Sequence, residues 1–204
     1  MGALLLADHL RHTDRLRLRD GNTLTVRFAR PDDAEAVQRY VQGLSARSRY
    51  NRFLGALSEL PAGLLNQFIH AGEDDHFSVL AVVMISGMQT IVGEARYGFE
   101  PATGDFEFGM SVDDRWQGHG IGSALLGNLE CRAAALGGLR MFGDTLRSNE
   151  AMMALARKSG FSFTRHPDDW KLVRFEKEID LTPAEIPCAS WRLVAEQRAL
   201  AAMA

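Results

Sequence analysis

The sequence predicts an α/β protein, with a mixed and mostly antiparallel sheet of about six to seven strands and helices on both faces. Three observations predict this fold class. Some segments alternate apolar and polar residues as strands do, others repeat apolar residues every three or four positions as helices do, and the strand-like segments follow one another in the middle of the chain. The 204 residues, 46% hydrophobic and 24% charged, suffice for one domain with a buried core.

The chain is expected to contain one domain with two extensions. Residues 1–22 form an N-terminal extension, residues 23–180 the domain, and residues 181–204 a partly helical tail. No apolar run approaches the length of a membrane span, and a net charge of −3 with a pI near 6.1 gives no basic footprint for nucleic acid. Cys131 and Cys188 lack the spacing of metal ligands. We therefore expect a cytoplasmic protein with two unpaired thiols, no metal, and no membrane or nucleic-acid partner.

The first part of the domain predicts one strand followed by three helices. Pro31 and two aspartates stand at a helix start, where acidic groups meet the positive end of the helix dipole. Ser45 can cap the next helix, and Pro61 lies in the first turn of the third. The predicted segments are a strand at 24–30 and helices at 31–44, 46–57 and 58–72.

The rest of the domain predicts three consecutive strands and then helix, strand, helix, strand and strand. The turn Ser86-Gly87 separates the first two strands, and Asn149 and Gly160 mark the start and the end of the second helix. The predicted segments are strands at 76–85, 88–100 and 106–112, a helix at 120–138, a strand at 139–144, a helix at 149–160, and strands at 161–166 and 171–179.

Three glycines alternate in the stretch WQGHGIGSALL, residues 116–126, directly before the clearest predicted helix. The N–H groups at a helix start are unpaired, so a phosphate is stabilised there, and glycine lets it approach closely. A nucleoside-triphosphate loop would need Lys-Ser or Lys-Thr after Gly122, where this chain has Ser123-Ala124. A dinucleotide site is disfavoured, because the pattern is Gly-x-Gly-x-Gly and the preceding strand alternates instead of being continuously apolar.

The segment Gln117–Gly122 is similar to the Gln/Arg-x-x-Gly-x-Gly/Ala signature of the GNAT acyl-CoA N-acyltransferases. The chain resembles that superfamily over residues 24–180, and residues 149–161 resemble its second cofactor helix with the closing Gly-Phe. Residues 44–57, LSARSRYNRFLGAL, resemble the GNAT domain of bacterial protein lysine acetyltransferases of the Pat type. The resemblance implies the GNAT fold, acetyl-CoA as cosubstrate and an amine as acceptor.

The resemblance also implies which residues bind acetyl-CoA. Its pyrophosphate would lie on the N–H groups of residues 117–122, and its pantetheine arm would run along the strand at 106–112. A backbone N–H of Met110, Ser111 or Val112 would polarise the thioester carbonyl. The expected cofactor-binding residues are Met110, Ser111, Val112, Gln117, Gly118, His119, Gly120, Ile121, Gly122, Ser123, Asn149 and Met152.

The reaction needs a general base, because an amine attacks a thioester only in its neutral form. Glu107 is the first candidate, since it matches the Glu of a Pat-like Ala-Glu-Phe-Ala element and its two flanking phenylalanines are expected to raise its pKa. Glu94 in the preceding strand is the second. Many family members place a Tyr four residues before the closing Gly to protonate the leaving thiolate. Here that position is Ala156, so solvent or another residue such as Tyr97 would serve.

Protein lysine is the first choice of acceptor, because of the Pat-like stretch. A small amine such as a polyamine, an amino acid or an antibiotic is the second, and a catalytically weak CoA-binding sensor is a third interpretation. The basic and aromatic run at 47–53 is interpreted as a solvated helix face with Tyr50 and Phe53 packed inward; the alternative is a surface for an acidic partner. Trp191 is expected to anchor the tail helix or a dimer contact, which leaves a homodimer open.

Overall fold

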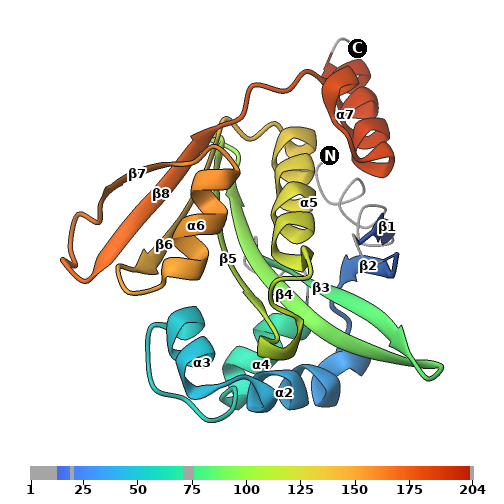
Figure 1. The fold of residues 1–204 in the computed structure, drawn as a ribbon. Helices are drawn as coiled ribbons and strands as arrows, with labels where there is room; N and C mark the ends of the chain where they lie inside the picture. The colour runs from blue at the N-terminus through green and yellow to red at the C-terminus, as the bar shows by residue number, and fades with distance from the viewer. Residues whose placement is uncertain (1–12, 19–20, 71–75, 203–204) are drawn as a thin grey trace.

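A computed structural model of the chain describes residues 13–18, 21–70 and 76–202, and Figure 1 shows their arrangement. The described residues form an eight-stranded sheet in the order β1-β2-β3-β4-β5-β6-β8-β7. The strands are β1 (Thr13–Arg17), β2 (Thr23–Phe28), β3 (His76–Ile85), β4 (Met88–Glu100), β5 (Asp105–Val112), β6 (Arg140–Leu146), β7 (Ser162–Arg165) and β8 (Leu172–Glu178). The helices are α2 (Ala34–Gly43), α3 (Ala46–Phe53), α4 (Ala62–Ile69), α5 (Ile121–Leu136), α6 (Glu150–Lys158) and α7 (Ala189–Ala202), with short 3-10 helices η1 (Pro31–Asp33), η3 (Asp114–Trp116) and η4 (Pro183–Glu185). The predicted fold class is confirmed, with slightly more strands than predicted.

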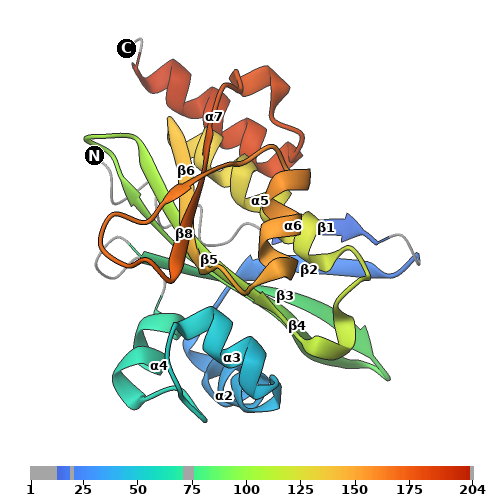
Figure 2. The same cartoon turned by 60° about the vertical axis from the view of Figure 1, so that its left-hand side comes forward.

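The sheet is antiparallel except between β5 and β6. Within the described chain these two strands pair only over Asp105–Glu107 and Arg140–Phe142, and then they diverge (Figures 1 and 2). A side chain at Gly143 would meet the carbonyl oxygen of Phe108 at 2.6 Å, so glycine is required where β6 passes β5. The sheet is therefore split at the carboxyl ends of its two parallel strands.

The helices cover the two faces of the sheet in separate groups. One face carries α5 and α6, with α7 against α5, and the other carries α2, α3 and α4 (Figures 1 and 2). Successive residues of β3 point to opposite faces: Val79 and Ala81 enter the core under α5, whereas Leu80 and Val82 enter the core under α2 and α4. Among the helices of the described residues, none is both long and apolar enough to cross a membrane.

The predicted helix starts are more accurate than the predicted helix ends. The hydroxyl of Ser45 accepts the N–H of Ser48 and so caps α3 as predicted. The helix stops at Phe53, several residues early, because Leu54 takes a left-handed φ of 54°. Gly72, predicted near the end of the third helix, lies outside the described residues.

Both ends of the described chain pack against the domain, one as a strand of the sheet and the other as a helix. β1, which belongs to the predicted extension of residues 1–22, pairs with β2 and adds the strand that the prediction lacked. The tail supplies α7, which packs against α5. In the middle of the chain, the predicted turn Ser86-Gly87 joins β3 to β4 with left-handed φ values of 49° and 80°.

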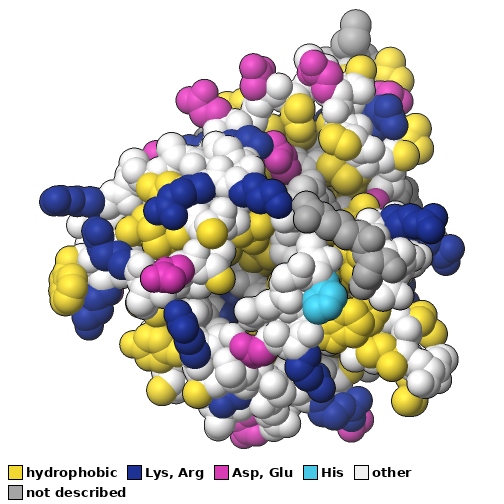
Figure 3. Space-filling model, viewed as in Figure 1, with side chains coloured by type: hydrophobic (Ala, Val, Ile, Leu, Met, Phe, Trp, Pro, Cys, Tyr) yellow, Lys and Arg dark blue, Asp and Glu magenta, His cyan; other side chains and the backbone are white. Residues whose placement is uncertain are grey.

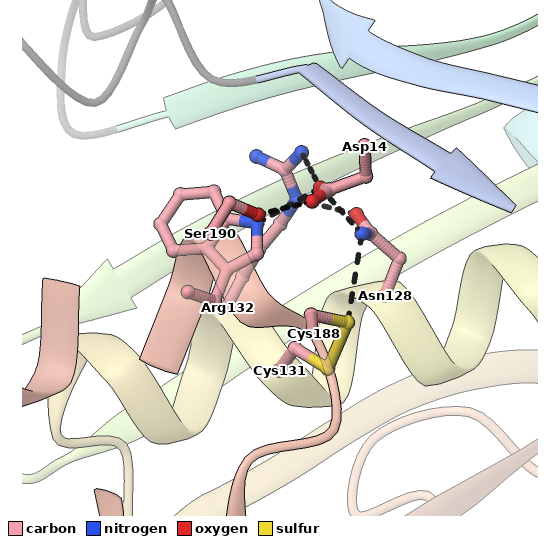
Figure 4. The surroundings of a disulfide bond; sticks show 7 residues. Asp14, Asn128, Cys131, Arg132, Cys188 and Ser190 are labelled. Carbon is pink, nitrogen blue, oxygen red and sulfur yellow. Dashed lines mark hydrogen bonds and ion pairs between the residues drawn. A yellow bond between two sulfur atoms is a disulfide. The ribbon is translucent and has the colours of Figure 1, made fainter. Parts of the chain in front are cut away.

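A buried aspartate joins β1, α5 and α7 (Figure 4). Asp14 accepts hydrogen bonds from Trp191 Nε1 at 3.0 Å, from Asn128 Nδ2 at 2.7 Å and from the Ser190 hydroxyl. The fully buried Arg132 forms an ion pair with Asp14 at 3.6 Å, and its guanidinium lies 4.5 Å from the centroid of the Trp191 ring. Trp191 therefore anchors the tail helix, which was one of its two predicted roles.

Cys131 on α5 and Cys188, just before α7, form a disulfide beside this aspartate (Figure 4). The expectation of two unpaired thiols is therefore wrong. The two cysteines are 57 residues apart in sequence, and only the docking of the tail on α5 brings their Cα atoms to 6.0 Å. Sequence spacing carried no sign of this pairing.

Candidate active site

A cavity of about 780 Å³ opens where β5 and β6 diverge. It lies between α3, the N-terminus of α5, and α6, outside the carboxyl ends of strands, where sheets with helices on both faces commonly bind ligands. The predicted cofactor-binding residues all line this cavity except Ile121, whose side chain is fully buried in the core. One site thus brings together the glycine stretch, the end of β5 and the start of α6.

The N-terminus of α5 directs unpaired backbone N–H groups at the cavity. Gly118 and Gly120 adopt left-handed φ values of 82° and 87°, and no side chain caps the helix at Gly120. A side chain at Gly122 would meet Leu155 at 3.2 Å, so glycine there lets α5 approach α6. Because the first N–H groups of a helix have no partner within it and carry positive partial charge, this end of α5 suits an anionic group.

Cationic side chains from distant segments also line the cavity. Arg17 on β1, Arg47 on α3 and Lys158 on α6 are exposed there. Two acidic residues, Asp114 and Glu150, line it too, but the carboxylate of Asp114 is directed at the N-terminus of α3. Sequence reasoning missed Arg17 and Lys158 as ligand-binding candidates and considered Arg47 only for an acidic partner surface, because the three cations share no motif and meet only in the folded chain.

The end of β5 offers backbone groups to the space that β6 leaves. The N–H of Asp113 donates to the carbonyl of Val92 on β4 at 2.9 Å, and in an antiparallel pair every second residue bonds the same neighbour. The main chain of Ser111 therefore faces β4, whereas the N–H groups of Met110 and Val112 face the cavity. Two of the three predicted thioester-polarising donors thus have the required direction.

A buried polar cluster forms the wall of the cavity beneath β5. Arg52 Nε and Nη2 donate to the two carboxylate oxygens of Glu94 at 2.6 and 3.0 Å. The Ser111 hydroxyl donates to Glu94 Oε1 at 2.6 Å, and the Tyr40 hydroxyl lies 3.0 Å from Ser111 Oγ. A side chain at Gly109 would meet Arg52 Nη1 at 2.9 Å, so glycine makes room for the guanidinium. Arg52 and Ser111 line the cavity, while Glu94 is completely buried.

Burial and charge fix the protonation states in this cluster. Burial disfavours the charge on Arg52, but the carboxylate of Glu94 outweighs it and raises the pKa of Arg52 above its ordinary value. Burial, reinforced by the charge of Glu94, raises the pKa of Tyr40 well above its ordinary value. Tyr40 therefore keeps its proton and donates to Ser111, which in turn donates to Glu94.

The interpretation of residues 47–53 as a solvated helix face is corrected at two positions. Only 12% of the Arg52 side chain is exposed, and its guanidinium pairs with Glu94 instead of facing solvent. Tyr50, expected to pack inward, is 46% exposed. Phe53 does pack inward, against the core that Phe68 belongs to. In this helix a charged residue therefore faces the protein and an aromatic residue faces solvent, which helical periodicity alone does not predict.

Glu107, the first candidate for the base, lies on the same face of β5 as Ser111 and is exposed. Phe106 and Phe108 point to the opposite face, where both are buried, so the expectation of apolar surroundings for this carboxylate is wrong. Arg174 on β8 is a charged neighbour, and its pKa is raised by Asp144 first and to a lesser degree by Glu107. Glu107 lies beside the cavity wall and is not among the residues that line it.

Tyr97 cannot protonate a leaving thiolate in the cavity. Its ring is stacked between Phe77 and Phe106, with centroid separations of 5.1 and 4.5 Å, and it is buried in the core. Burial raises the pKa of its hydroxyl. The suggestion of Tyr97 as general acid is therefore wrong, and Ala156, at the position where many relatives carry Tyr, is fully buried.

The loop before α5 is fastened to α3 and to itself. Asp114 accepts the N–H of Ser45 at 2.8 Å and the hydroxyls of Ser45 and Ser48 at 2.9 and 2.7 Å. Asp113 accepts the N–H of Arg115 and two of its guanidinium N–H groups. These bonds hold the loop that leads into the glycine stretch.

Asn149 and His119 also line the cavity, and they make different contacts. Asn149 accepts the N–H of Met152 and so caps α6 as predicted, and its amide also donates to Thr145 at 3.0 Å. His119 is exposed, and its Nδ1 lies 3.0 Å from the carbonyl of Gln117. Among the described residues, no cluster of three or more His, Cys, Asp or Glu side chains is arranged to hold a metal ion.

Comparison with known proteins gives one family, two relatives and one solved structure that this chain is similar to. The acetyltransferase (GNAT) family matches residues 45–161. An acetyltransferase of Pseudomonas aeruginosa is 30% identical over 152 residues, which cover 74% of this chain and 82% of that protein. The acetyltransferase Pat of Mycolicibacterium smegmatis is 27% identical over 171 residues, which are 83% of this chain but only 49% of Pat, so the chain spans about half the length of that relative. The crystal structure of the GNAT domain of S. lividans Pat superimposes with a TM-score of 0.73 and 27% identity, over 81% of this chain and 96% of that domain.

Proposed function

Because the chain belongs to the acetyltransferase (GNAT) family and is an acyl-CoA-dependent N-acetyltransferase, we propose that it transfers the acetyl group of acetyl-CoA to the side-chain amine of a protein lysine. The observation that carries the proposal is the cavity at the split between β5 and β6, where an uncapped helix N-terminus and free strand N–H groups face the same space. The likeness to Pat supports lysine as the acceptor. We assign residues 23–180 to the catalytic domain.

The residues that line the cavity fit acetyl-CoA. The free N–H groups at the start of α5 suit its pyrophosphate, and Ser123 adds a hydroxyl donor. Arg17 and Lys158 supply further positive charge for phosphate groups. The N–H groups of Met110 and Val112 are directed so that an extended pantetheine arm can bond to β5 as a further strand would.

We assign the general base to Glu107 and a positioning role to Glu94. The neutral amine nitrogen forms a bond to the thioester carbon, the carbon–sulfur bond breaks, and the CoA thiolate leaves; the proton of the amine passes to Glu107 directly or through water. The position of Glu107 supports this, because it lies on the same face of β5 as Ser111, which lines the cavity. Both oxygens of Glu94 accept hydrogen bonds from Arg52, and one also accepts from Ser111, so this carboxylate holds two residues of the cavity wall in place.

Acetyl transfer to a panel of proteins and small amines, followed by mass spectrometry, tests the acceptor. We expect acetylated lysine side chains. Transfer to polyamines, amino acids or antibiotics alone would overturn the lysine proposal. No transfer to any amine, with CoA bound in titration calorimetry, would instead identify a CoA-binding sensor.

Glu107→Gln tests the base. We expect kcat to fall about 10²- to 10⁴-fold, the usual range for loss of general-base catalysis, while CoA affinity stays constant. Glu178→Gln is the matched control, since this exposed glutamate lies on the same face of the sheet at the far end of β8. Unchanged turnover in Glu107→Gln would remove Glu107 from the mechanism.

A further inference from the structure

A second depression lies beside the candidate active site, between α3 and the connection of β7 to β8. We call it the hairpin groove; its volume is about 630 Å³, and its walls include Arg47, Tyr50, Asn51, Arg147, Trp170 and Lys171. Arg47 and Asn51 also line the main cavity. The groove and the cavity are therefore neighbours along one helix, α3.

The hairpin groove carries positive charge without carboxylate partners. Arg47, Arg147 and Lys171 line it, all three are exposed, and no acidic residue is part of its lining. Among the ion pairs of the described residues, none includes any of these three side chains. Arg140 and Arg174 on the neighbouring strands, by contrast, are paired with aspartates. Since the whole chain has a net charge of −3, the excess of cations is a property of this groove.

The three cationic side chains contact backbone or ring atoms of other residues that line the groove. Arg147 Nε donates to the carbonyl of Trp170 at 2.6 Å, and Arg47 Nη2 donates to the carbonyl of Ser148 at 3.4 Å. Lys171 Nζ lies 5.9 Å from the centroid of the Trp170 ring. The nearby Asp169 accepts the backbone N–H of Lys171 at 2.8 Å, so this carboxylate is already engaged.

Two aromatic rings are exposed in the same groove. Trp170 is 78% exposed and Tyr50 is 46% exposed. Figure 3 shows Lys and Arg side chains gathered around hydrophobic ones on the left of the molecule, over α3 and the β7–β8 hairpin. Tryptophan, tyrosine and arginine are the residues most enriched where protein interfaces gain their affinity.

We propose that the hairpin groove binds an acidic stretch of the acceptor protein beside its target lysine. The proposal rests on the proposed protein-lysine acceptor and adds the chemistry that selects it. Asp and Glu side chains of the acceptor pair with Arg47, Arg147 and Lys171, and the chain between them packs on Trp170 and Tyr50. The target lysine reaches the main cavity past α3, on the side of the sheet that carries Glu107.

Two fluorescent peptides test the groove. Each has one central lysine and equal length, and its flanks are either aspartate and glutamate or serine. We expect fluorescence anisotropy, with CoA present, to show about tenfold tighter binding of the acidic peptide at low salt, and this preference should shrink as the salt concentration rises. Initial rates of acetylation should follow the same order.

The double substitution Arg147→Glu with Lys171→Glu should abolish the preference for the acidic peptide. Trp170→Ala should weaken the binding of both peptides without changing the preference for the acidic one. This variant keeps the proposal testable if the charge reversal fails to fold. Arg192→Glu on α7, at the opposite end of the molecule, is a charge-reversal control outside the groove and should keep the preference.

The two readouts separate this proposal from the proposed function. Binding that depends on the groove, without acetylation of any lysine, would support the groove and overturn the protein-lysine acceptor. Acetylation at equal rates of the acidic and serine-flanked peptides, or a preference that survives the double substitution, would overturn the groove while the acceptor stands.

Discussion

At the scale of single residues, the wall of the candidate active site depends on a buried ion pair. Arg52 and Glu94 are brought together by α3 and β4, and Gly109 on β5 leaves the space that the guanidinium fills. The pair is bidentate and Ser111 donates a third hydrogen bond to the carboxylate. Such a pair is costly to break by removing Arg52, because Glu94 is completely buried and would keep its charge without a partner.

Arg52→Leu is therefore expected to lower the free energy of unfolding by about 3–5 kcal/mol, since it leaves the Glu94 carboxylate buried without a counter-charge. The double variant Arg52→Leu with Glu94→Leu should lose less free energy of unfolding than the sum of the losses in the two single variants. Arg39→Leu is the control, because its pair with Glu35 is exposed and should contribute under about 1 kcal/mol. Urea denaturation measures all four variants, and equal losses for Arg52→Leu and Arg39→Leu would contradict the prediction.

The glycine stretch supports a second prediction at this scale. Gly120 and Gly87 have similar left-handed φ values, 87° and 80°, and at both an added methyl group meets no atom within 4 Å. Alanine should strain the backbone equally at both positions, by about 1–2 kcal/mol. Only Gly120→Ala places a methyl group at the start of α5 inside the cavity, so only this variant should lose CoA affinity, by about tenfold in calorimetry. Equal affinities would remove the α5 N-terminus from the CoA site.

Single residues differ in how far the sequence predicts them. Gly120 and Asn149 are predictable, because a helix start and a helix cap are set by adjacent residues. Arg52 and Tyr40 are not, because their partners Glu94 and Ser111 come from strands that only the sheet order brings beside them. The sequence therefore predicts the α5 and α6 side of the candidate site better than the side formed by α2, α3 and β4.

At the scale of elements, α3 is held by a residue from a different segment. Ser45 caps the helix, and Asp114 in the loop before α5 then bonds Ser45 and Ser48 together. Burial alone would raise the pKa of Asp114, but the hydrogen bonds from the Ser45 N–H and from both hydroxyls outweigh it and lower the pKa. The helix periodicity predicted α3, whereas its early end at Leu54 depends on a backbone conformation that propensities do not show.

Asp114→Ala should destabilise the protein by about 1 kcal/mol at pH 7, a usual loss for a helix-capping contact at an exposed site. Because the folded-state pKa lies below 3.8, the stabilisation by Asp114 is present above that pH and is lost as the pH falls through the folded-state value. The difference between wild type and Asp114→Ala should thus vanish in strongly acidic solution. Urea titrations at several pH values measure it, with the exposed Asp180→Ala as control; a difference independent of pH would contradict the assignment.

At the scale of the whole molecule, the two ends of the described chain are fastened to the same helix. Asp14, Arg132 and Trp191 join β1, α5 and α7, and the disulfide between Cys131 and Cys188 lies beside them. The order of strands and helices is predictable, because each has its own period in the sequence. The contacts that attach the two ends to α5 are not predictable, since each joins segments that lie far apart in the chain.

Reduction of the disulfide should lower the melting temperature by about 8–16 °C, because a cross-link closing a loop of this length contributes roughly 4 kcal/mol. The double variant Cys131→Ala and Cys188→Ala is the control, and its melting temperature should not respond to reductant. Thiol titration of the unfolded, non-reduced wild type should find no free thiol. Two titratable thiols would show that the bond is absent and would contradict the prediction.

The direction of the β5 backbone has a consequence for hydrogen exchange. The amide hydrogens of Met110 and Val112 face the cavity, beyond the three residue pairs that join β5 to β6 in the described chain, whereas the amide hydrogen of Ser111 faces β4. In the free protein, Met110 and Val112 should exchange quickly and Ser111 slowly. A saturating concentration of CoA should slow the first two and leave the third unchanged, so alternate amides of one strand would report that the ligand has taken the place of a neighbouring strand.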